Sequence, residues 1–337
     1  MSEVPSVAIL GAGSVGCFIG GTWAAAGVKV RLIGRPRLAD EIARYGLTLS
    51  DYAGWEKHLP PQTVDYQTDP EALSEAAIIA LTVKSGDTQA AAELISRHSN
   101  GALVISFQNG LSNLDVLGEA LRGRFDVARG LVSYNVANLG AGRFHKGVAG
   151  DLYAERSPAT EALADAVGEG PATLRLSDDM LSLAWGKLLI NLNNAVNALS
   201  GMTLRDELRN RSCRRLFAAS LREGLRILGR AGIRPAKVGP ISPDMMPGII
   251  DLPDWLFNPL VMRRWKIDAK ARSSMADDLV AGRTTEVDFL NGELVRLAEQ
   301  LGLDAPINRA IVGMIHKAEK GAQPLSEAAL NQAARGL

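Results

Sequence analysis

The sequence has few cysteines, no excess of charge of either sign and no apolar run long enough to cross a membrane. Only two of its 337 residues are cysteines, and Cys17 and Cys213 lie in unrelated contexts, which favours reduced thiols in a cytoplasmic protein. Lysine plus arginine and aspartate plus glutamate number 37 each, so net charge gives no reason to expect nucleic acid or a membrane surface as a partner. The apolar residues 7–28 lack a basic leader and are interrupted by glycines, unlike a signal peptide. We therefore expect a soluble globular protein, and the length predicts two domains.

The first half of the chain alternates short apolar runs with helical patterns. Such alternation predicts parallel βαβ units and an α/β fold with a Rossmann-type doubly wound sheet. The predicted strands cover residues 6–10, 29–33, 76–83 and 102–107, and the predicted helices cover 14–26, 88–98 and 113–121.

After residue 127 the pattern changes twice. Extended segments with turn residues, at 127–137, 142–147 and 150–155, predict antiparallel additions to the same sheet, followed by a helix and a strand at 173–176. From Asp178 onward nearly all signals are helical, and the predicted helices cover 178–200, 213–231, 284–302 and 308–320. The proline-rich residues 234–255 predict an irregular excursion or a lid. We expect a dinucleotide-binding domain at 1–176 and an all-helical substrate domain at 177–337.

A glycine-rich loop follows the first predicted strand and opens the first predicted helix. Gly11, Gly13 and Gly16 have G-x-G-x-x-G spacing, which allows a tight turn, close approach of the backbone to a pyrophosphate, and close helix–strand packing. The free N–H groups and the dipole at the start of the helix favour phosphate binding there. The loop predicts a dinucleotide site, with a plain structural turn as the alternative. The intervening residues that we assign to the cofactor are Ala12, Ser14 and Val15.

The end of the second strand distinguishes between the two nicotinamide cofactors. An acidic residue there would bind the ribose 2′-hydroxyl of NAD, but this chain has Arg35 and Arg37 and no carboxylate. Because a guanidinium suits a 2′-phosphate, we favour NADP(H), with Arg35 closer to the strand end. Solvated surface arginines and an NAD-linked protein are the alternatives.

Polar residues follow the next two predicted strands. Lys84 ends "ALTVK", and Gln108 and Asn109 end "VISFQN". Ligands of doubly wound sheets bind outside the carboxyl ends of the strands. We therefore assign Lys84 and Asn109 to the site, against the alternatives of a solvated lysine and a simple turn.

The predicted helix at residues 185–199 has more polar side chains than a core helix tolerates. At about 100° per residue, Lys187, Asn191 and Asn194 fall in one narrow stripe, Asn197 lies at its edge, and Asn193 lies well off it. A buried amide without a partner costs roughly 1–3 kcal/mol, so these groups must bind other protein groups or a ligand. The stripe resembles the wall of a site, with a snorkelling lysine and satisfied core amides as the alternative.

Further polar residues come late in the chain. Ser274 and Asp278 are spaced to share a helical face. In "RTTEVDFLNG" a helix start is expected, with Thr284 or Thr285 as its cap and Glu286 in its first turn. The helix dipole accounts for such a glutamate, and its alternative role is to anchor a substrate hydroxyl near Lys187.

In their order along the chain, these motifs resemble the ketopantoate reductases (2-dehydropantoate 2-reductases). The shared segments are "GAGSVG", "TVKS" with Lys84, "QNG" with Asn109, "WGKLLIN" with Lys187 and Asn191, "SSM" with Ser274, and "TEVDFLNG" with Glu286.

The resemblance implies an enzyme of pantothenate biosynthesis with a Rossmann domain and a helical domain, and with NADPH and a 2-oxo acid bound between them. It implies that Lys187 is the general acid and that Glu286 binds and orients the substrate. Asn109, Asn191 and Ser274 would contact substrate or nicotinamide, and Lys84 would lie beside the cofactor. No residue is assigned to a metal. A lysine ammonium fits the chemistry, because hydride transfer to a C2 carbonyl creates an alkoxide that needs a proton, and a nearby glutamate would keep the ammonium charged.

Three positions depart from the family pattern, namely Ala195 and Ala271, where the family usually has asparagine, and Arg205 in "RDEL" in place of "NGEL". The leading hypothesis is an NADPH-dependent reductase of ketopantoate. A reductase of another branched or bulky 2-oxo acid is the close alternative, and a non-catalytic NADP-binding sensor is an alternative of another class. The oligomeric state is open, with a homodimer as one alternative.

Overall fold

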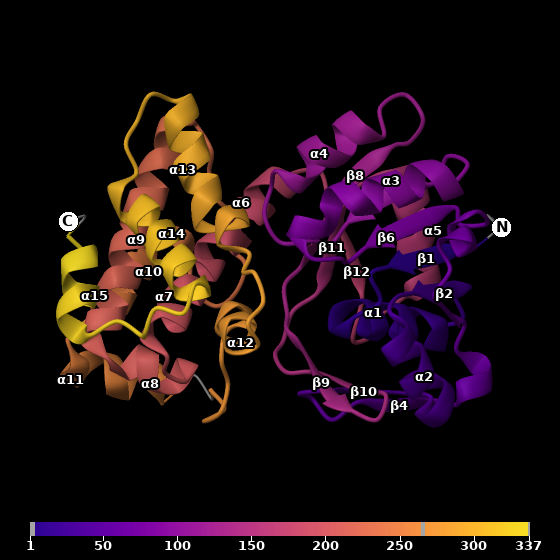
Figure 1. The fold of residues 1–337 in the computed structure, drawn as a ribbon, viewed down its shortest axis with the longest axis horizontal. Helices are drawn as coiled ribbons and strands as arrows, with labels where there is room; N and C mark the ends of the chain where they lie inside the picture. Colours follow the sequence, from indigo (N-terminus) through magenta and orange to yellow (C-terminus); the bar gives the residue numbers. More distant parts are fainter. Residues whose placement is uncertain (1–3, 264–266, 336–337) are drawn as a thin grey trace. The chain divides into compact units, whose positions relative to one another are not determined.

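The computed structural model describes residues 4–263 and 267–335, and its chain forms two compact units, residues 1–180 and 181–337 (Figure 1). The division falls at the start of helix α6 (Met180–Asn191). The first unit contains both sheets, and the described part of the second is helical.

An eight-stranded sheet forms the centre of the first unit, with strand order β12-β11-β8-β7-β6-β1-β2-β5. The strands are β1 (Val7–Leu10), β2 (Val30–Ile33), β5 (Tyr66–Gln67), β6 (Ile78–Leu81), β7 (Leu103–Ser106), β8 (Val127–Val132), β11 (Leu152–Glu155) and β12 (Leu174–Ser177). The six neighbouring strands β8, β7, β6, β1, β2 and β5 are parallel to one another, and β11 pairs antiparallel with β8. The chain reverses its direction of travel across the sheet between β1 and β6. The predicted Rossmann-type doubly wound sheet is confirmed, and its switch point lies beside the glycine loop.

Helices cover both faces of this sheet. They are α1 (Ser14–Ala25), α3 (Thr88–His98), α4 (Asn113–Ala120) and α5 (Pro158–Val167). Along β1, Val7 and Ile9 pack into the core that includes α1 and α5, whereas Ala8 and Leu10 pack into the core that includes α3 and α4. This alternation is expected of a strand buried on both faces.

A second, four-stranded sheet packs against α1, and the sequence did not predict it. Its order is β4-β3-β10-β9, with β3 (Leu47–Asp51), β4 (Glu56–Leu59), β9 (Val136–Gly140) and β10 (Arg143–Lys146). Three segments were expected to extend the main sheet. Residues 150–155 do so as β11, whereas residues 142–147 form β10 of the second sheet. The segment 127–137 divides, because β8 joins the main sheet and β9 joins the second. Strand β10 pairs parallel with β3 instead. A Cβ on Gly21 of α1 would collide with Leu47 of β3, so this sheet approaches the helix closely.

The second unit consists of helices in its described residues. They are α6, α7 (Asn193–Ser200), α8 (Leu204–Arg209), α9 (Arg211–Arg230), α10 (Met246–Ile250), α11 (Asp254–Phe257), α12 (Ser274–Val280), α13 (Asn291–Gln300), α14 (Pro306–Glu319) and α15 (Glu327–Ala333). The single helix predicted at 178–200 is interrupted only at Leu192, whose dihedral angles remain helical. The helix predicted at 284–302 begins at Asn291, because residues 287–289 form a separate 3₁₀ turn, η6 (Val287–Phe289).

The proline-rich segment is more ordered than an irregular excursion, since it contains α10 and the start of α11. Arg214 of α9 is fully buried and fixes the C-terminal end of this segment. It donates hydrogen bonds to the carbonyls of Ile250 and Leu252 at 3.0 Å each and to the Asp254 carboxylate at 2.6 Å. The beginning of the segment lies on α6, where the Ala236 N–H donates to the Ser182 carbonyl at 2.8 Å. The segment is therefore fixed to the helical unit at both ends.

Candidate functional site

The glycine loop has the geometry of a dinucleotide cradle. Gly11 has φ +95° and its missing Cβ would lie 2.5 Å from the Val83 nitrogen, so only glycine fits. A Cβ on Gly16 would lie 2.6 Å from the Thr82 hydroxyl. At Gly13, which caps α1, the nearest atom to a Cβ would be 3.8 Å away. No neighbouring protein atom demands glycine at position 13, so this glycine leaves open space beside the first-turn amides of α1.

Two residues that the sequence did not single out hold this loop. The Thr82 hydroxyl, directly after β6, donates to the Gly11 carbonyl at 2.9 Å. The Tyr66 hydroxyl of β5 donates to the Ala12 carbonyl at 3.1 Å, and a Cβ on Gly34 would collide with it. Burial raises the pKa of Tyr66, so it remains a donor. The only sequence signal for these contacts was the position of Thr82 at a strand end.

Arg35 lies where the sequence placed it, at the end of β2 and immediately before helix α2 (Pro36–Tyr45). Its side chain and that of Arg37 are exposed, and Arg35 has no ion-pair partner within residues 4–263 and 267–335. An exposed guanidinium without a carboxylate partner suits an incoming phosphate.

Lys84 and Asn109 lie on loops that a hydrogen-bond network joins. The Ser85 hydroxyl donates to the Asn109 carbonyl at 2.9 Å, and Asn113 of α4 donates to the same carbonyl at 2.6 Å. Gln108 is buried and donates to the Lys84 carbonyl at 3.3 Å, which gives it a structural role. The structure thus brings Lys84 and Asn109 to the carboxyl ends of β6 and β7, next to the strand that leads into the glycine loop.

Lys187 of α6 is half-buried in the helical unit and is unpaired. Within the described parts of the chain it forms no ion pair or hydrogen bond. Burial lowers the pKa of its amine from the usual value to about 8. We expected a glutamate to hold this ammonium and keep it charged, but within residues 4–263 and 267–335 no carboxylate pairs with it and burial alone shifts its pKa.

The asparagines near Lys187 divide into two groups. Asn193 donates to Glu207 at 3.1 Å, and Asn197, fully buried, accepts from the Ser273 N–H at 2.9 Å and donates to the Met202 carbonyl at 3.1 Å. These two amides are structural.

The other two asparagines belong to the stripe that contains Lys187. Asn191 is buried and is engaged in the structure. The half-buried side-chain amide of Asn194 has no hydrogen-bond partner within residues 4–263 and 267–335. In this stripe, Lys187 and the Asn194 amide are therefore the polar side chains that no residue in 4–263 or 267–335 binds.

Ser274 and Asp278 both belong to α12, as the sequence predicted, but they differ in burial. Ser274 is exposed, whereas Asp278 is buried and pairs with Arg283 at 2.9 Å. The residue that caps α12 is Ser273, which accepts from the Ala276 N–H at 3.1 Å. Ser274 is thus left at the surface of the helix start.

Glu286 immediately precedes η6 and not the long helix α13. Thr285 is buried, and its hydroxyl accepts from the Val287 N–H at 3.3 Å, so the predicted cap acts on the short turn. Glu286 is half-buried and is engaged in the structure.

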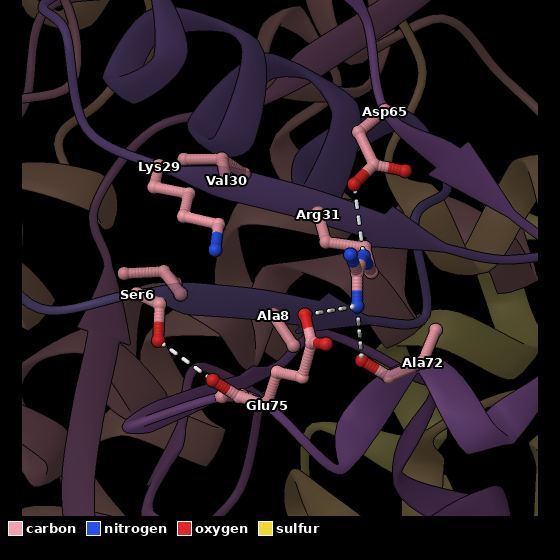
Figure 2. A pocket seen from close by; sticks show the side chains of 10 residues that line it. Ser6, Ala8, Lys29, Val30, Arg31, Asp65, Ala72 and Glu75 are labelled. Atoms are coloured by element: carbon pink, nitrogen blue, oxygen red, sulfur yellow. Dashed lines mark hydrogen bonds and ion pairs between the residues drawn. The ribbon is translucent and has the colours of Figure 1, made fainter.

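A small cavity lies at the opposite, amino end of β1 and β2 (Figure 2). Arg31 fills one side, pairing with Asp65 at 2.8 Å and with Glu75 at 3.4 Å, and the Ser6 hydroxyl donates to the Glu75 carbonyl at 2.8 Å. Its volume of about 20 Å³ is too small for an organic ligand, and the Arg31, Asp65 and Glu75 side chains that line it already pair with one another. It is not a candidate site.

The described residues contain neither a metal-binding cluster nor a membrane-spanning helix. No cluster of three His, Cys, Asp or Glu side chains there could hold a metal ion. No helix in the same residues has both the length and the apolar character needed to span a bilayer. Cys17 and Cys213 are buried and unpaired, and burial raises the pKa of both thiols, so they are poor nucleophiles.

Comparison with known proteins covers nearly the whole chain. The sequence profile described as "Ketopantoate reductase PanE/ApbA" matches residues 7–158, and "Ketopantoate reductase PanE/ApbA C terminal" matches residues 179–319. The 2-dehydropantoate 2-reductase of Archaeoglobus fulgidus is 26% identical over 326 residues, which are 95% of this chain and 99% of that protein.

Solved structures show the same fold. The PanE/ApbA family ketopantoate reductase of Ralstonia eutropha JMP134 is 28% identical, with a TM-score of 0.78 over 94% of this chain and 98% of that one. D-mandelate dehydrogenase, solved with NADH and anilino(oxo)acetate, is 18% identical, with a TM-score of 0.75 over 94% of this chain and 98% of that one, and it shows similarity of fold alone.

The doubly wound sheet, the glycine loop and the helical second unit define a nucleotide-dependent oxidoreductase with a Rossmann-type domain. Together the two profile matches show that the chain belongs to the ketopantoate reductase family. The resemblance inferred from the motifs is confirmed.

Proposed function

We propose that this protein reduces a 2-oxo acid to its 2-hydroxy acid with NADPH, and that ketopantoate is the substrate. A bound nicotinamide supplies the hydride for such a reaction. The observation that carries the proposal is Lys187, a half-buried amine with a pKa of about 8 that no described residue pairs with, on the same stripe as Asn191 and Asn194. Family membership and the relatives named as 2-dehydropantoate 2-reductases support the substrate.

Each unit supplies different parts of the proposed chemistry. In the first unit, Gly13 and the first-turn amides of α1 would hold the pyrophosphate, and Arg35 would bind the 2′-phosphate of NADPH. Lys84 and Asn109 would line the cofactor at the ends of β6 and β7. These residues fit the cofactor, because a Cβ at position 13 would occupy the space that the phosphates need and because Arg35 has no carboxylate partner in the described residues.

In the second unit, Lys187 would donate its proton to the carbonyl oxygen as negative charge develops there. A lysine pKa near neutrality suits a general acid, since the ammonium is still populated and gives up its proton readily. We propose that Glu286 binds and orients the substrate, and that Asn191 and Ser274 donate or accept hydrogen bonds around it. An ammonium that no carboxylate neutralises also attracts the carboxylate of a 2-oxo acid.

One observation favours a second candidate substrate, a different branched or bulky 2-oxo acid. Ala195 is fully buried and Ala271 half-buried, so two positions where the family usually places asparagine offer no amide to a substrate hydroxyl. A pocket that lacks a hydrogen-bond partner no longer selects strongly for that hydroxyl. In a D-mandelate dehydrogenase, a protein of this fold, anilino(oxo)acetate is bound together with NADH.

NADPH oxidation with a panel of 2-oxo acids tests the proposal. The highest kcat/KM is expected for ketopantoate, and a better value for phenylglyoxylate or another bulky oxo acid would select the second candidate. No turnover of any 2-oxo acid, with NADPH still bound, would contradict both and favour a sensor. A homodimer remains a proposal, which light scattering of the purified protein tests.

A further inference from the structure

The last turn of α14 is connected to the segment that contains Glu286. Glu319, the final residue of α14, accepts hydrogen bonds from both the Thr285 N–H and the Thr285 hydroxyl through the same carboxylate oxygen, at 2.8 Å each. Its second oxygen bonds His316 Nδ1 at 3.0 Å. Glu319 is thus fully engaged, with one oxygen on the residue before Glu286 and the other on its own helix.

The same histidine reaches the other side of Glu286. His316 Nε2 lies 3.1 Å from the Asp288 carboxylate, two residues after Glu286. The intervening Val287 is fully buried, and the Glu286 carbonyl accepts from the Phe289 N–H at 3.0 Å. Side chains of one helix therefore hold the residues on both sides of Glu286. Glu319 binds Thr285 through its N–H and hydroxyl, and His316 binds Asp288 through its carboxylate.

The contacts of this network favour a protonated His316 and an ionised Glu319. The hydrogen bond with Glu319, aided by Asp288, raises the pKa of His316. Partial burial opposes ionisation of Glu319, but the bonds from His316 and Thr285 outweigh it and lower its pKa. A protonated imidazole donates to both carboxylates at once, so the three side chains act as one unit.

We infer that Glu319 and His316 are positioning residues, which fix the Thr285–Asp288 turn so that Glu286 presents its carboxylate in one orientation to the substrate. The inference rests on the proposed function of Glu286. Neither residue needs to touch the substrate, because Glu319 acts through Thr285 and His316 acts through the Asp288 carboxylate, on either side of Glu286. Small displacements of a substrate-orienting group are costly, since a shift of about 1 Å can reduce the rate by roughly 100-fold.

The test compares Glu319→Ala, Glu286→Ala and the double variant in the full-length protein, with KM and kcat for the 2-oxo acid and Kd for NADPH as readouts. We expect Glu319→Ala to raise KM for the oxo acid by about tenfold or more, with the Kd for NADPH unchanged. Glu319→Gln keeps an acceptor for Thr285 and should recover most of the loss. Because Glu319 acts through Glu286, the double variant should be little worse than Glu286→Ala alone.

Glu299→Ala is the matched control. Glu299 pairs with Arg309 of α14 at 2.8 Å, so it also joins α13 to α14 through a carboxylate, but it does not contact the Thr285–Asp288 turn. This variant should leave KM unchanged. If Glu319→Ala does not fold, His316→Gln tests the same network at a more exposed position, and it should raise KM by roughly threefold.

The outcomes separate the two proposals. If Glu286→Ala raises KM and both Glu319→Ala and His316→Gln leave it unchanged, the positioning role of Glu319 and His316 is overturned, whereas the proposed role of Glu286 stands. Additive effects of Glu286→Ala and Glu319→Ala would also overturn it, because they would show that Glu319 acts by another route. No effect of Glu286→Ala on KM would overturn the proposed substrate anchor and this inference with it.

Discussion

If Lys187 is the general acid, as we propose, its pKa predicts how the rate of reduction depends on pH. Burial lowers this pKa from 10.5 to about 8, and no carboxylate in the described residues counteracts it. A general acid must be protonated, so the rate of reduction falls as pH rises through the pKa. About nine-tenths of the amine is protonated at pH 7 and about one-tenth at pH 9, so kcat/KM should fall by roughly tenfold between them.

An ordinary lysine would behave very differently over the same range. With a pKa of 10.5, about 97% of the amine would still be protonated at pH 9, and almost no change would be seen. The measurement is kcat/KM for the oxo acid at saturating NADPH from pH 6 to 9.5. Lys187→Arg is the control, since a guanidinium does not titrate here and the alkaline decline should disappear. A flat profile to pH 9, or the same decline in the arginine variant, would refute the assignment.

Further substitutions test the cofactor site and the stability of the helical unit. Arg35→Ala should weaken NADPH binding by roughly 10- to 100-fold, as expected for a lost hydrogen bond to a charged group. NADH binding should be unchanged in this variant, and the neighbouring Arg37→Ala variant should bind NADPH as wild type does. Equal losses for both cofactors would contradict a 2′-phosphate contact. Gly13→Ala should weaken NADPH binding in titrations without changing the thermal midpoint, whereas Gly16→Ala should lower that midpoint; unchanged affinity in Gly13→Ala would argue against a phosphate there. Burial raises the pKa of Glu207 from 4.5 to about 8, so ionisation disfavours folding increasingly as pH rises between those values. In urea unfolding, Glu207→Gln should therefore gain on the order of 3 kcal/mol over wild type from pH 5 to 7.5; a pH-independent difference would contradict this.

The parts of the fold that the sequence predicted depend on local signals. The glycine loop, the apolar strands β1, β6 and β7, and the helices between them are encoded within short windows. Strands β3 and β10 were missed or misplaced because their pairing is non-local. Ser50 and His145, whose side chains lie 2.9 Å apart, are separated by 95 residues in the chain. Such a contact leaves no trace in the periodicity of either segment.

The candidate site shows the same limit. The stripe of Lys187 and Asn191 followed from helical geometry, but the structural role of Asn193 depends on Glu207, 14 residues away, and that of Asn197 on Ser273, 76 residues away. The helix expected to start at Thr284 or Thr285 starts later because Glu319 of α14 binds Thr285 and the chain forms a separate turn. The sequence also could not predict that Lys187 has no carboxylate partner within the described chain.

Single-turnover reduction tests most directly whether the Lys187 amine supplies the proton. The enzyme, saturated with NADPH, is mixed with the oxo acid, and the loss of NADPH absorbance is followed in wild type and in Lys187→Ala. The account predicts that the variant transfers hydride at least about 100-fold more slowly while it binds NADPH within about twofold of wild type. Transfer at the wild-type rate in Lys187→Ala would contradict it.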